Sequence, residues 1–193
     1  MKNYSKNTKG EDFKLLPYLT ADLRRARMLI YGVSDEANIL RLWLGIVSPR
    51  FIPVLLCRLA SFFYCLKLMP IAKAFSLFNF FFFGIEIAVK CHIGKGLFFP
   101  HTQGTVIGAY YIGENAIIYQ GVTLGARELE FCYLKSSRPV VGDNVTIGSG
   151  AKILGGLNIG SGSRIGANAV VLESIPSNTV AVGIPARIAR HLI

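Results

Sequence analysis

The feature of this 193-residue sequence that most constrains its fold is a six-residue period in the C-terminal half. The units VGDNVT, IGSGAK, ILGGLN, IGSGSR, IGANAV and VLESIP follow one another over residues 141–176, and each begins with an aliphatic residue. A helix has a period of 3.6 residues, so a single helix would not place these side chains on one face. The pattern predicts a β-helix, in which each unit forms one short strand with its aliphatic side chain inward and glycine or asparagine at the corners.

The same register extends upstream and fails at two places. Units beginning at Ile112 and Ile118 lead to Leu124, and with three units per coil the repeat predicts about five stacked coils that supply one another's core. The stretch 99–111 does not divide into sixes, and 17 residues separate Leu124 from Val141. We expect a loop extruded from a coil over residues 126–139, because insertions in such repeats lie on one face, often the binding face.

Residues 1–84 form a separate apolar and basic segment, and residues 85–193 form the β-helix domain. The segment predicts helices at 20–31, 35–47 and 53–68, with either a helix or a strand at 74–83. The chain carries 21 Lys and Arg against 11 Asp and Glu, and most of the excess lies in its first 90 residues. Such a charge favours an anionic partner, although no basic stripe or motif indicates nucleic acid.

The apolar part of this segment is too interrupted to cross a membrane. Its longest uncharged run, Ala74–Ile85, is about half of the ~20 residues that a spanning helix needs. We therefore expect these helices to lie on an anionic membrane surface or to pack in the core of an oligomer.

Cysteine and histidine usage indicates a reduced chain without a metal. The four cysteines show neither a CxxC motif nor a metal-binding spacing, and residues 1–20 do not resemble a signal peptide. His92, His101 and His191 do not form the three-histidine set of a zinc enzyme. The expected location is the cytoplasm, with peripheral attachment to the inner membrane as an added option.

The segments IGKGLFFPHTQGTVIG, IYQGVTLG and VGIPARI, together with the six-residue units, resemble the serine O-acetyltransferase branch of the hexapeptide-repeat acyltransferases. The resemblance implies a left-handed parallel β-helix of all-β type after the α-helical segment, and a homotrimer, alone or paired with a second trimer. It also implies acetyl-CoA as the acyl donor, no metal, and direct transfer in a ternary complex. His101 matches the general base of that family, and base assistance contributes about 10²–10⁴-fold.

The resemblance also implies which residues surround the reacting groups. Arg138 stands where the family has a second histidine, and we expect it to stabilise the oxyanion or to bind an acidic sugar. The residues expected to hold acetyl-CoA between adjacent β-helices are Gly125, Ala126, Ser149, Lys152, Ala167, Pro185 and Arg187. The residues expected to line the acceptor site are Gln103, Tyr119 and Gln120.

The departures from the family decide the acceptor that we expect. Pro100 replaces the acidic residue beside the base, and Arg138 replaces the second histidine, so groups that hold an amino acid are missing. The short N-terminal segment resembles that of acetyltransferases of bacterial surface polysaccharides. We therefore expect a sugar hydroxyl of a capsule, exopolysaccharide or O-antigen, or of its precursor, as the acceptor. Serine O-acetyltransferase of cysteine biosynthesis is the alternative enzyme, and a non-catalytic β-helix scaffold is the alternative of another class.

Overall fold

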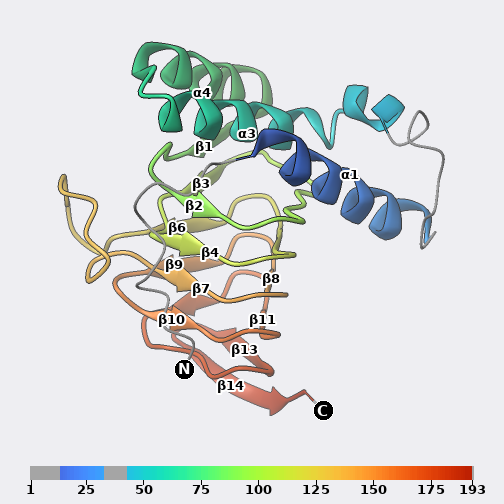
Figure 1. Ribbon diagram of the computed structural model, residues 1–193. Helices are drawn as coiled ribbons and strands as arrows, with labels where there is room; N and C mark the ends of the chain where they lie inside the picture. The colour runs from blue at the N-terminus through green and yellow to red at the C-terminus, as the bar shows by residue number, and fades with distance from the viewer. Residues whose placement is uncertain (1–13, 33–42, 193) are drawn as a thin grey trace.

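The computed structural model describes residues 14–32 and 43–192, which form a β-helix with a helical cap at its N-terminal end (Figure 1). The cap contains α1 (Leu15–Tyr31), the 3₁₀ turn η1 (Gly45–Val47), α3 (Ile52–Cys65) and α4 (Met69–Phe83). The C-terminus lies at the opposite end of the β-helix from α3 and α4.

The helix boundaries follow local signals but differ from those expected. Proline lies in the first turn of both α3 and α4, where its missing N–H costs no hydrogen bond. Gly32 and Gly84 end α1 and α4 in the left-handed conformation, with φ of +67° and +60°.

The expected helix at 20–31 begins earlier, at Leu15, and the one at 53–68 ends at Cys65. The stretch 74–83 is helical and belongs to α4, which starts at Met69. The buried residues of α4 lie on one narrow side of the helix, and such a pattern suits a helix better than a strand. Most of the helix expected at 35–47 lies outside the described residues.

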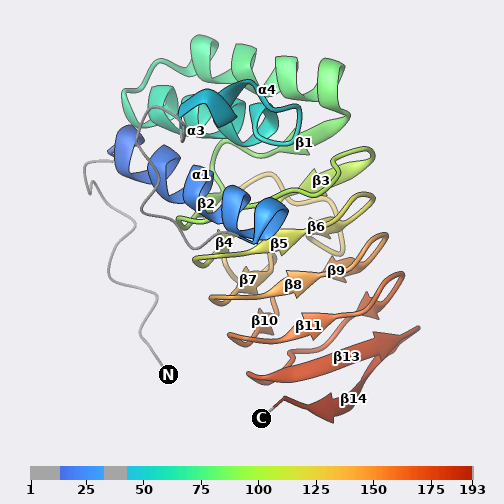
Figure 2. The same cartoon turned by 90° about the vertical axis from the view of Figure 1, so that its right-hand side faces the viewer.

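The β-helix consists of three sheets whose strands run parallel, one short strand from each coil (Figures 1 and 2). The first sheet contains β1 (Ile85–Ile87), β3 (Thr105–Ile107), β6 (Thr123–Gly125), β9 (Lys152–Leu154) and β12 (Val170–Val171). The second contains β2 (His92–Ile93), β4 (Tyr111–Ile112), β7 (Val140–Val141) and β10 (Asn158–Ile159). The third contains β5 (Ile117–Ile118), β8 (Thr146–Ile147), β11 (Arg164–Ile165), β13 (Thr179–Gly183) and the antiparallel β14 (Ala186–His191).

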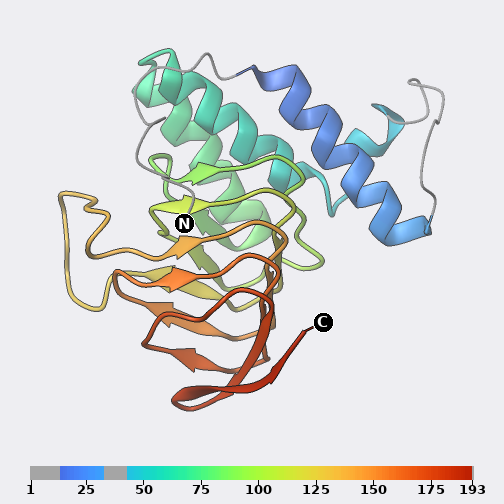
Figure 3. The same ribbon diagram turned by 60° about the horizontal axis from the view of Figure 1, so that its bottom comes forward.

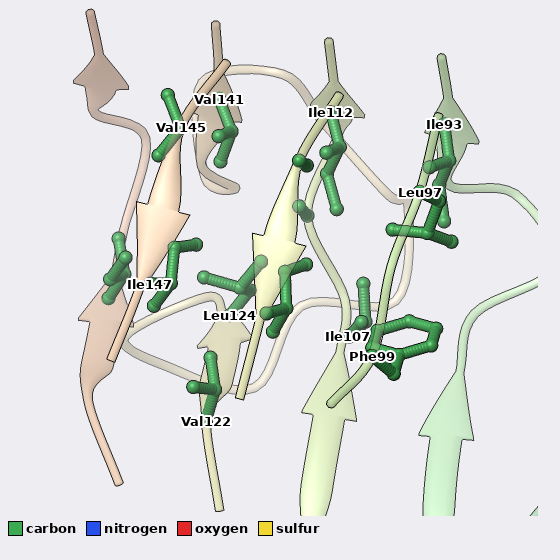
Figure 4. Close-up of a cluster of buried hydrophobic side chains, with 14 of the residues drawn as sticks. Ile93, Leu97, Phe99, Ile107, Ile112, Val122, Leu124, Val141, Val145 and Ile147 are labelled. Carbon is green, nitrogen blue, oxygen red and sulfur yellow. The ribbon is translucent and has the colours of Figure 1, made fainter. Parts of the chain in front are cut away.

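The six-residue period places one aliphatic side chain per strand in the interior. In the first sheet Ile107 pairs with Leu124, Leu124 with Ile153, and Ile153 with Val171, and all four side chains are buried. Figure 4 shows the inward side chains of three neighbouring coils filling the space between the sheets. Each coil therefore depends on its neighbours for its apolar contacts, as the repeat predicts.

The two interruptions of the period are loops that leave the coil. Phe99 is buried in register with Ile93, but the next buried aliphatic residue is Ile107, and residues 100–104 form a short external loop that carries His101. Residues 126–139 connect β6 to β7 and project from the side of the β-helix (Figure 3).

The helical cap and the first coil share one hydrophobic core. Leu23 of α1 and Val54 of α3 belong to the same buried cluster as Ile85 and Leu97 of the first coil. The segment at 1–84 is thus packed directly on the β-helix over the residues described.

Candidate active site

The loop that carries His101 is held on both sides. The Thr102 hydroxyl donates to the carbonyl of Phe83 at 2.7 Å, and the Gly104 N–H donates to the carbonyl of Gly84 at 2.9 Å. Gly104 has a φ of +72°, which lets the chain turn sharply into β3. The side chain of His101 is exposed on this loop, so a solvent-accessible imidazole stands on a backbone that the end of α4 holds in place.

Below His101 the turns from the third sheet to the first lie in a column, at the right of Figure 2. We call this column the His101 edge; it comprises residues 101–104, 119–121, 148–150 and 166–168. Backbone N–H groups link each turn to the carbonyl of the turn above: Gly121 to Gln103 at 3.0 Å, Gly150 to Gln120 at 2.9 Å, and Asn168 to Ser149 at 2.8 Å. The structure therefore gathers on one edge half of the twelve residues expected at the site: His101, Gln103, Tyr119, Gln120, Ser149 and Ala167.

Two side chains give this edge its polarity. Lys152, the first residue of β9, donates its ammonium to the carbonyl of Gly121 and thereby brings a positive charge to the edge. The Gln120 carboxamide oxygen is buried and has no hydrogen-bond partner among the described residues. Because a buried acceptor without a donor is costly, this atom suits a ligand that carries an N–H group.

Pro185 and Arg187 lie at the far end of this edge. They belong to the turn and strand that follow β13, the last parallel strand of the third sheet. The Arg187 guanidinium lies 4.0 Å from the Glu173 carboxylate, and both side chains are exposed. Four coil steps of ~4.8 Å separate the Gln103 turn from this hairpin, so the edge is about 19 Å long.

Arg138 lies on a different edge, where the first sheet turns toward the second. Its Nη1 donates to the carbonyl of Gly108 at 2.9 Å, its Nε to the Glu130 carboxylate at 2.9 Å, and its Nη2 to the Glu130 carbonyl at 3.0 Å. His101 precedes β3 and Gly108 follows it, so about three strand residues, or ~10 Å, separate the two places. Within one chain Arg138 is directed at its own loop rather than at His101.

The contacts of the Arg138 guanidinium explain why it is held in this position. The guanidinium stacks on the Tyr133 ring at 4.2 Å, and the Tyr133 hydroxyl donates to the carbonyl of Ala109 at 2.7 Å. Desolvation would raise the pKa of Glu130, but the hydrogen bond and charge of Arg138 outweigh it and lower that pKa below its ordinary value. These contacts favour a role for Arg138 in anchoring the loop at 126–139.

Gly125 and Ala126 also lie on this second edge, at the end of β6. The loop shelters a groove of about 510 Å³ there, lined by residues 126–130 and 154–157, and a second of about 530 Å³ lies beside Leu134 and Asn158. The residues expected to hold acetyl-CoA therefore divide between two edges of the chain, with Gly125 and Ala126 on the loop side.

Glu86 is a residue near His101 that the sequence analysis missed. Ile85 and Ile87 are buried on either side of it, so Glu86 points outward from β1, two residues beyond Gly84. Since Gly84 bonds to the His101 loop and Glu86 pairs with Val106 of β3, this carboxylate belongs to the same corner as His101. The alternation of apolar and polar residues in GIEI is the sequence signal that marks Glu86 as an outward side chain, whereas Pro100 is only the neighbour of His101 in sequence.

No group of three or more His, Cys, Asp or Glu side chains in 14–32 and 43–192 is placed to hold a metal ion. Within the same ranges, no helix combines the length and apolar character required to cross a membrane.

Comparison with known proteins agrees with the repeat. Residues 138–173 match the family model described as bacterial transferase hexapeptide (six repeats). A serine acetyltransferase of Staphylococcus aureus is 47% identical over 167 residues, which cover 86% of this chain and 71% of that protein. One from Staphylococcus epidermidis is 50% identical over 122 residues, which cover 62% of this chain and 55% of that one.

Solved structures extend the similarity to the helical cap. The serine acetyltransferase of Neisseria gonorrhoeae superposes with a TM-score of 0.81 at 27% identity, covering 94% of this chain and 68% of its own. The Brucella abortus enzyme in complex with coenzyme A has a TM-score of 0.79 at 28% identity, covering 92% of this chain and 68% of its own. The likeness thus includes α1, α3 and α4 as well as the coils.

Proposed function

Because this chain belongs to the serine acetyltransferase family of hexapeptide-repeat transferases, we propose that it transfers the acetyl group of acetyl-CoA to the hydroxyl of L-serine. The single observation that carries the proposal is 47% identity over 167 residues to a serine acetyltransferase, of which the match covers 71%. The chain is an acetyl-CoA-dependent acyltransferase, and its fold is the left-handed β-helix with an N-terminal helical region. The product, an O-acetylated serine, would serve cysteine biosynthesis.

The expectation that a sugar hydroxyl of a surface polysaccharide is the acceptor is wrong. Both the relatives in sequence and the neighbours in structure are serine acetyltransferases, and the structural match includes the helical segment that suggested a polysaccharide enzyme. The error came from giving too much weight to Pro100 and Arg138, two single positions, against similarity along the whole chain. The scaffold alternative is wrong as well, since the chain is an enzyme.

In the proposed reaction His101 is the general base. A serine hydroxyl is a poor nucleophile near neutral pH, and an imidazole accepts its proton as the oxygen attacks the thioester carbon. The proton then passes from His101 to the departing thiolate of CoA, so that the imidazole returns to its neutral form. The oxyanion that develops on the carbonyl oxygen needs an N–H donor, which the exposed backbone of the His101 edge supplies.

We propose that Glu86 positions His101. A carboxylate that accepts the second ring N–H of a histidine selects the tautomer whose other nitrogen accepts a proton. Glu86 projects outward from β1 at the corner that also holds the His101 loop, and Pro100 leaves no acid beside His101 in sequence. Glu86 is thus the residue that we assign to this task.

The contacts of the other site residues with the substrates are proposed from the positions of those residues. The His101 edge offers the Gln120 carboxamide oxygen to an N–H group of serine or of the pantetheine arm, and Lys152 to a phosphate or carboxylate. Arg187 and Pro185 lie at its far end, where the nucleotide part of acetyl-CoA would extend. Gly125 and Ala126 can join this site only from a neighbouring copy, which supports a homotrimer; the proposed location is the cytoplasm.

The test is release of free CoA from acetyl-CoA in the presence of L-serine. We expect His101→Ala to lower kcat by about 10²–10⁴-fold, whereas His191→Ala, which changes an exposed histidine of β14, leaves it unchanged. Glu86→Gln should lower kcat and change its pH profile without a matching rise in KM. Release with a polysaccharide or a nucleotide sugar but not with L-serine would contradict the proposal.

A further inference from the structure

The outer face of α4 carries a large exposed apolar patch that the proposed reaction does not use. Phe81 and Phe82 are 71% and 70% exposed, and Leu77, Phe78 and Phe80 are each more than half exposed. Four half-exposed phenylalanines alone leave on the order of 500 Å² of apolar surface in water. This matches the largest patches on typical monomers, about 300–600 Å², which are often functional.

The orientation of this face is built into the cap. Asn79, on the opposite side of α4, is buried and donates its Nδ2 to the carbonyl of Pro53 at 2.9 Å. The Phe75 ring stacks on Phe63 of α3 at 5.5 Å. These contacts fix the inner side of α4, so the outward phenylalanines cannot rotate into the core.

The exposed charges of the described helical residues all have one sign. In the described helical residues 14–32 and 43–84, Asp22 is the one acidic residue, and it is buried against Arg58. Lys73 lies on the exposed side of α4, and Lys67 lies in the turn that precedes it, between the exposed Leu66 and Leu68. The surface around the phenylalanines is therefore cationic and complements an anionic partner.

We propose that α4 and the turn at 66–68 dock on the surface of an anionic phospholipid bilayer, with the helix lying in the plane of the headgroups. Aromatic side chains enter the boundary between headgroups and acyl chains, and each nearby lysine contributes about 1 kcal/mol of attraction to anionic lipid. α4 has 15 residues, so it lies on the bilayer and does not cross it.

The charges favour a bilayer over a second copy of the chain. In a two-fold contact the same patch meets itself, so Lys67 and Lys73 of one copy would face those of the other. The described helical residues offer no exposed carboxylate to offset them. Like charges across a contact cost several kcal/mol, whereas anionic headgroups neutralise them.

The experiment is flotation of the full chain with two kinds of vesicle, phosphatidylcholine alone and phosphatidylcholine mixed with phosphatidylglycerol. We expect binding to the mixed vesicles at low salt, weakening as salt is added. Phe81→Ser with Phe82→Ser should lower the partition coefficient at least about tenfold, because both rings leave the bilayer. Lys67→Glu with Lys73→Glu should lower it by at least about tenfold as well.

The matched control is Leu129→Ser with Phe131→Ser on the extruded loop, where both side chains are about nine-tenths exposed but lie far from α4. Each variant is first shown to keep the unfolding midpoint of the parent, and the α4 and lysine variants are also shown to keep its CoA-releasing activity. The proposal is overturned if the parent does not float with the mixed vesicles, or if the control pair lowers flotation as much as the α4 pair. It is also overturned if the α4 pair lowers the mass of the assembly in light scattering without lipid, since the face would then be buried between copies.

Discussion

Asp22 and Arg58 form a buried ion pair that joins the helical cap to the first coil. The Arg58 guanidinium donates to the Asp22 carboxylate at 2.8 Å and to the carbonyls of Ile93 and Gly94, and the N–H groups of Gly96 and Leu97 donate to Asp22. Burial alone would lower the pKa of Arg58, but the charge and hydrogen bond of Asp22 raise it, so the guanidinium remains charged. Four of the five guanidinium N–H groups and both carboxylate oxygens thereby have hydrogen-bond partners.

We expect Asp22→Ala to lower the free energy of unfolding by about 3–5 kcal/mol, because it leaves the Arg58 charge buried without a partner. Asp22→Leu combined with Arg58→Met should cost less than Asp22→Ala alone. Arg24→Ala, which changes an exposed residue of the same helix, serves as the control. Urea unfolding measures all three, and equal losses for Asp22→Ala and Arg24→Ala would show that the buried pair is not what stabilises the cap.

The four cysteines differ in exposure, which predicts their reactivity. Cys57 and Cys91 are buried, whereas Cys65 and Cys132 are exposed. Burial raises the pKa of Cys57 to about 11 from 9.0 and raises that of Cys91 further. A thiol-specific reagent near pH 8 should therefore label Cys65 and Cys132 rapidly, and Cys57 and Cys91 only after unfolding. Mass spectrometry of the labelled peptides checks this, and rapid labelling of Cys91 in the folded chain would contradict the packing.

The same pKa shift makes stability depend on pH at the alkaline end. Because the folded chain holds the Cys57 proton more tightly than the unfolded chain, its contribution is fully present below pH 9.0 and is lost as pH rises through about 11.

Among the elements, the loop at 126–139 owes its shape to Arg138. Residues with no repeat pattern would sample many conformations, but the Arg138 guanidinium joins Glu130 to Gly108, and Tyr133 joins the loop to Ala109. The tip remains outside this network, with Leu129 and Phe131 in solvent. The loop is therefore an ordered base that carries an exposed apolar tip.

We expect Arg138→Ala to accelerate chymotrypsin cleavage at Leu129 and Phe131 by at least about tenfold, since charge-assisted hydrogen bonds worth about 1.5–3 kcal/mol each are lost. The unfolding midpoint of the β-helix should change little, because the coils retain their apolar contacts. Lys135→Ala, at an exposed position of the same loop, is the matched control. Unchanged cleavage in Arg138→Ala would show that other contacts order the loop.

At the scale of the whole molecule, the residues of the proposed site divide between two edges of one chain. The His101 edge follows the third sheet, whereas Gly125, Ala126 and the extruded loop lie where the first sheet turns toward the second. Rotation of identical copies about a three-fold axis would bring the loop edge of one copy beside the His101 edge of the next. In a ring of three, each copy gives its loop edge to one neighbour and its His101 edge to the other.

We expect the purified protein to have a mass of three chains of 21.1 kDa, or of six if the trimers pair, in light scattering. Dilution to the monomer should abolish CoA release, because each site would lose the edge supplied by its neighbour. A fully active monomer would contradict this arrangement.

The sequence by itself determined the β-helix. Residues that stack in successive coils are separated by a nearly constant number of residues, so contacts between residues far apart in the chain still produce a six-residue period. Asn144 and Gly121 lie at corners of the coils and adopt the left-handed backbone conformation. The position of the extruded loop and the exposure of the His101 loop follow from the same register, because any residues that break the period must leave the coil.

Tertiary structure alone decided the rest. Glu86 pairs with Val106 of the strand that follows the His101 loop, Arg138 bonds to Glu130 and Gly108, and Asp22 bonds to Arg58. None of these pairings repeats along the chain, so no period in the sequence reveals them. These pairs join residues across turns and between the helical cap and the coils. There the distance between two residues depends on the three-dimensional path of the chain and not on a repeated spacing. The acceptor was misjudged for this reason: a site assembled from several edges cannot be evaluated from the residue next to His101 alone.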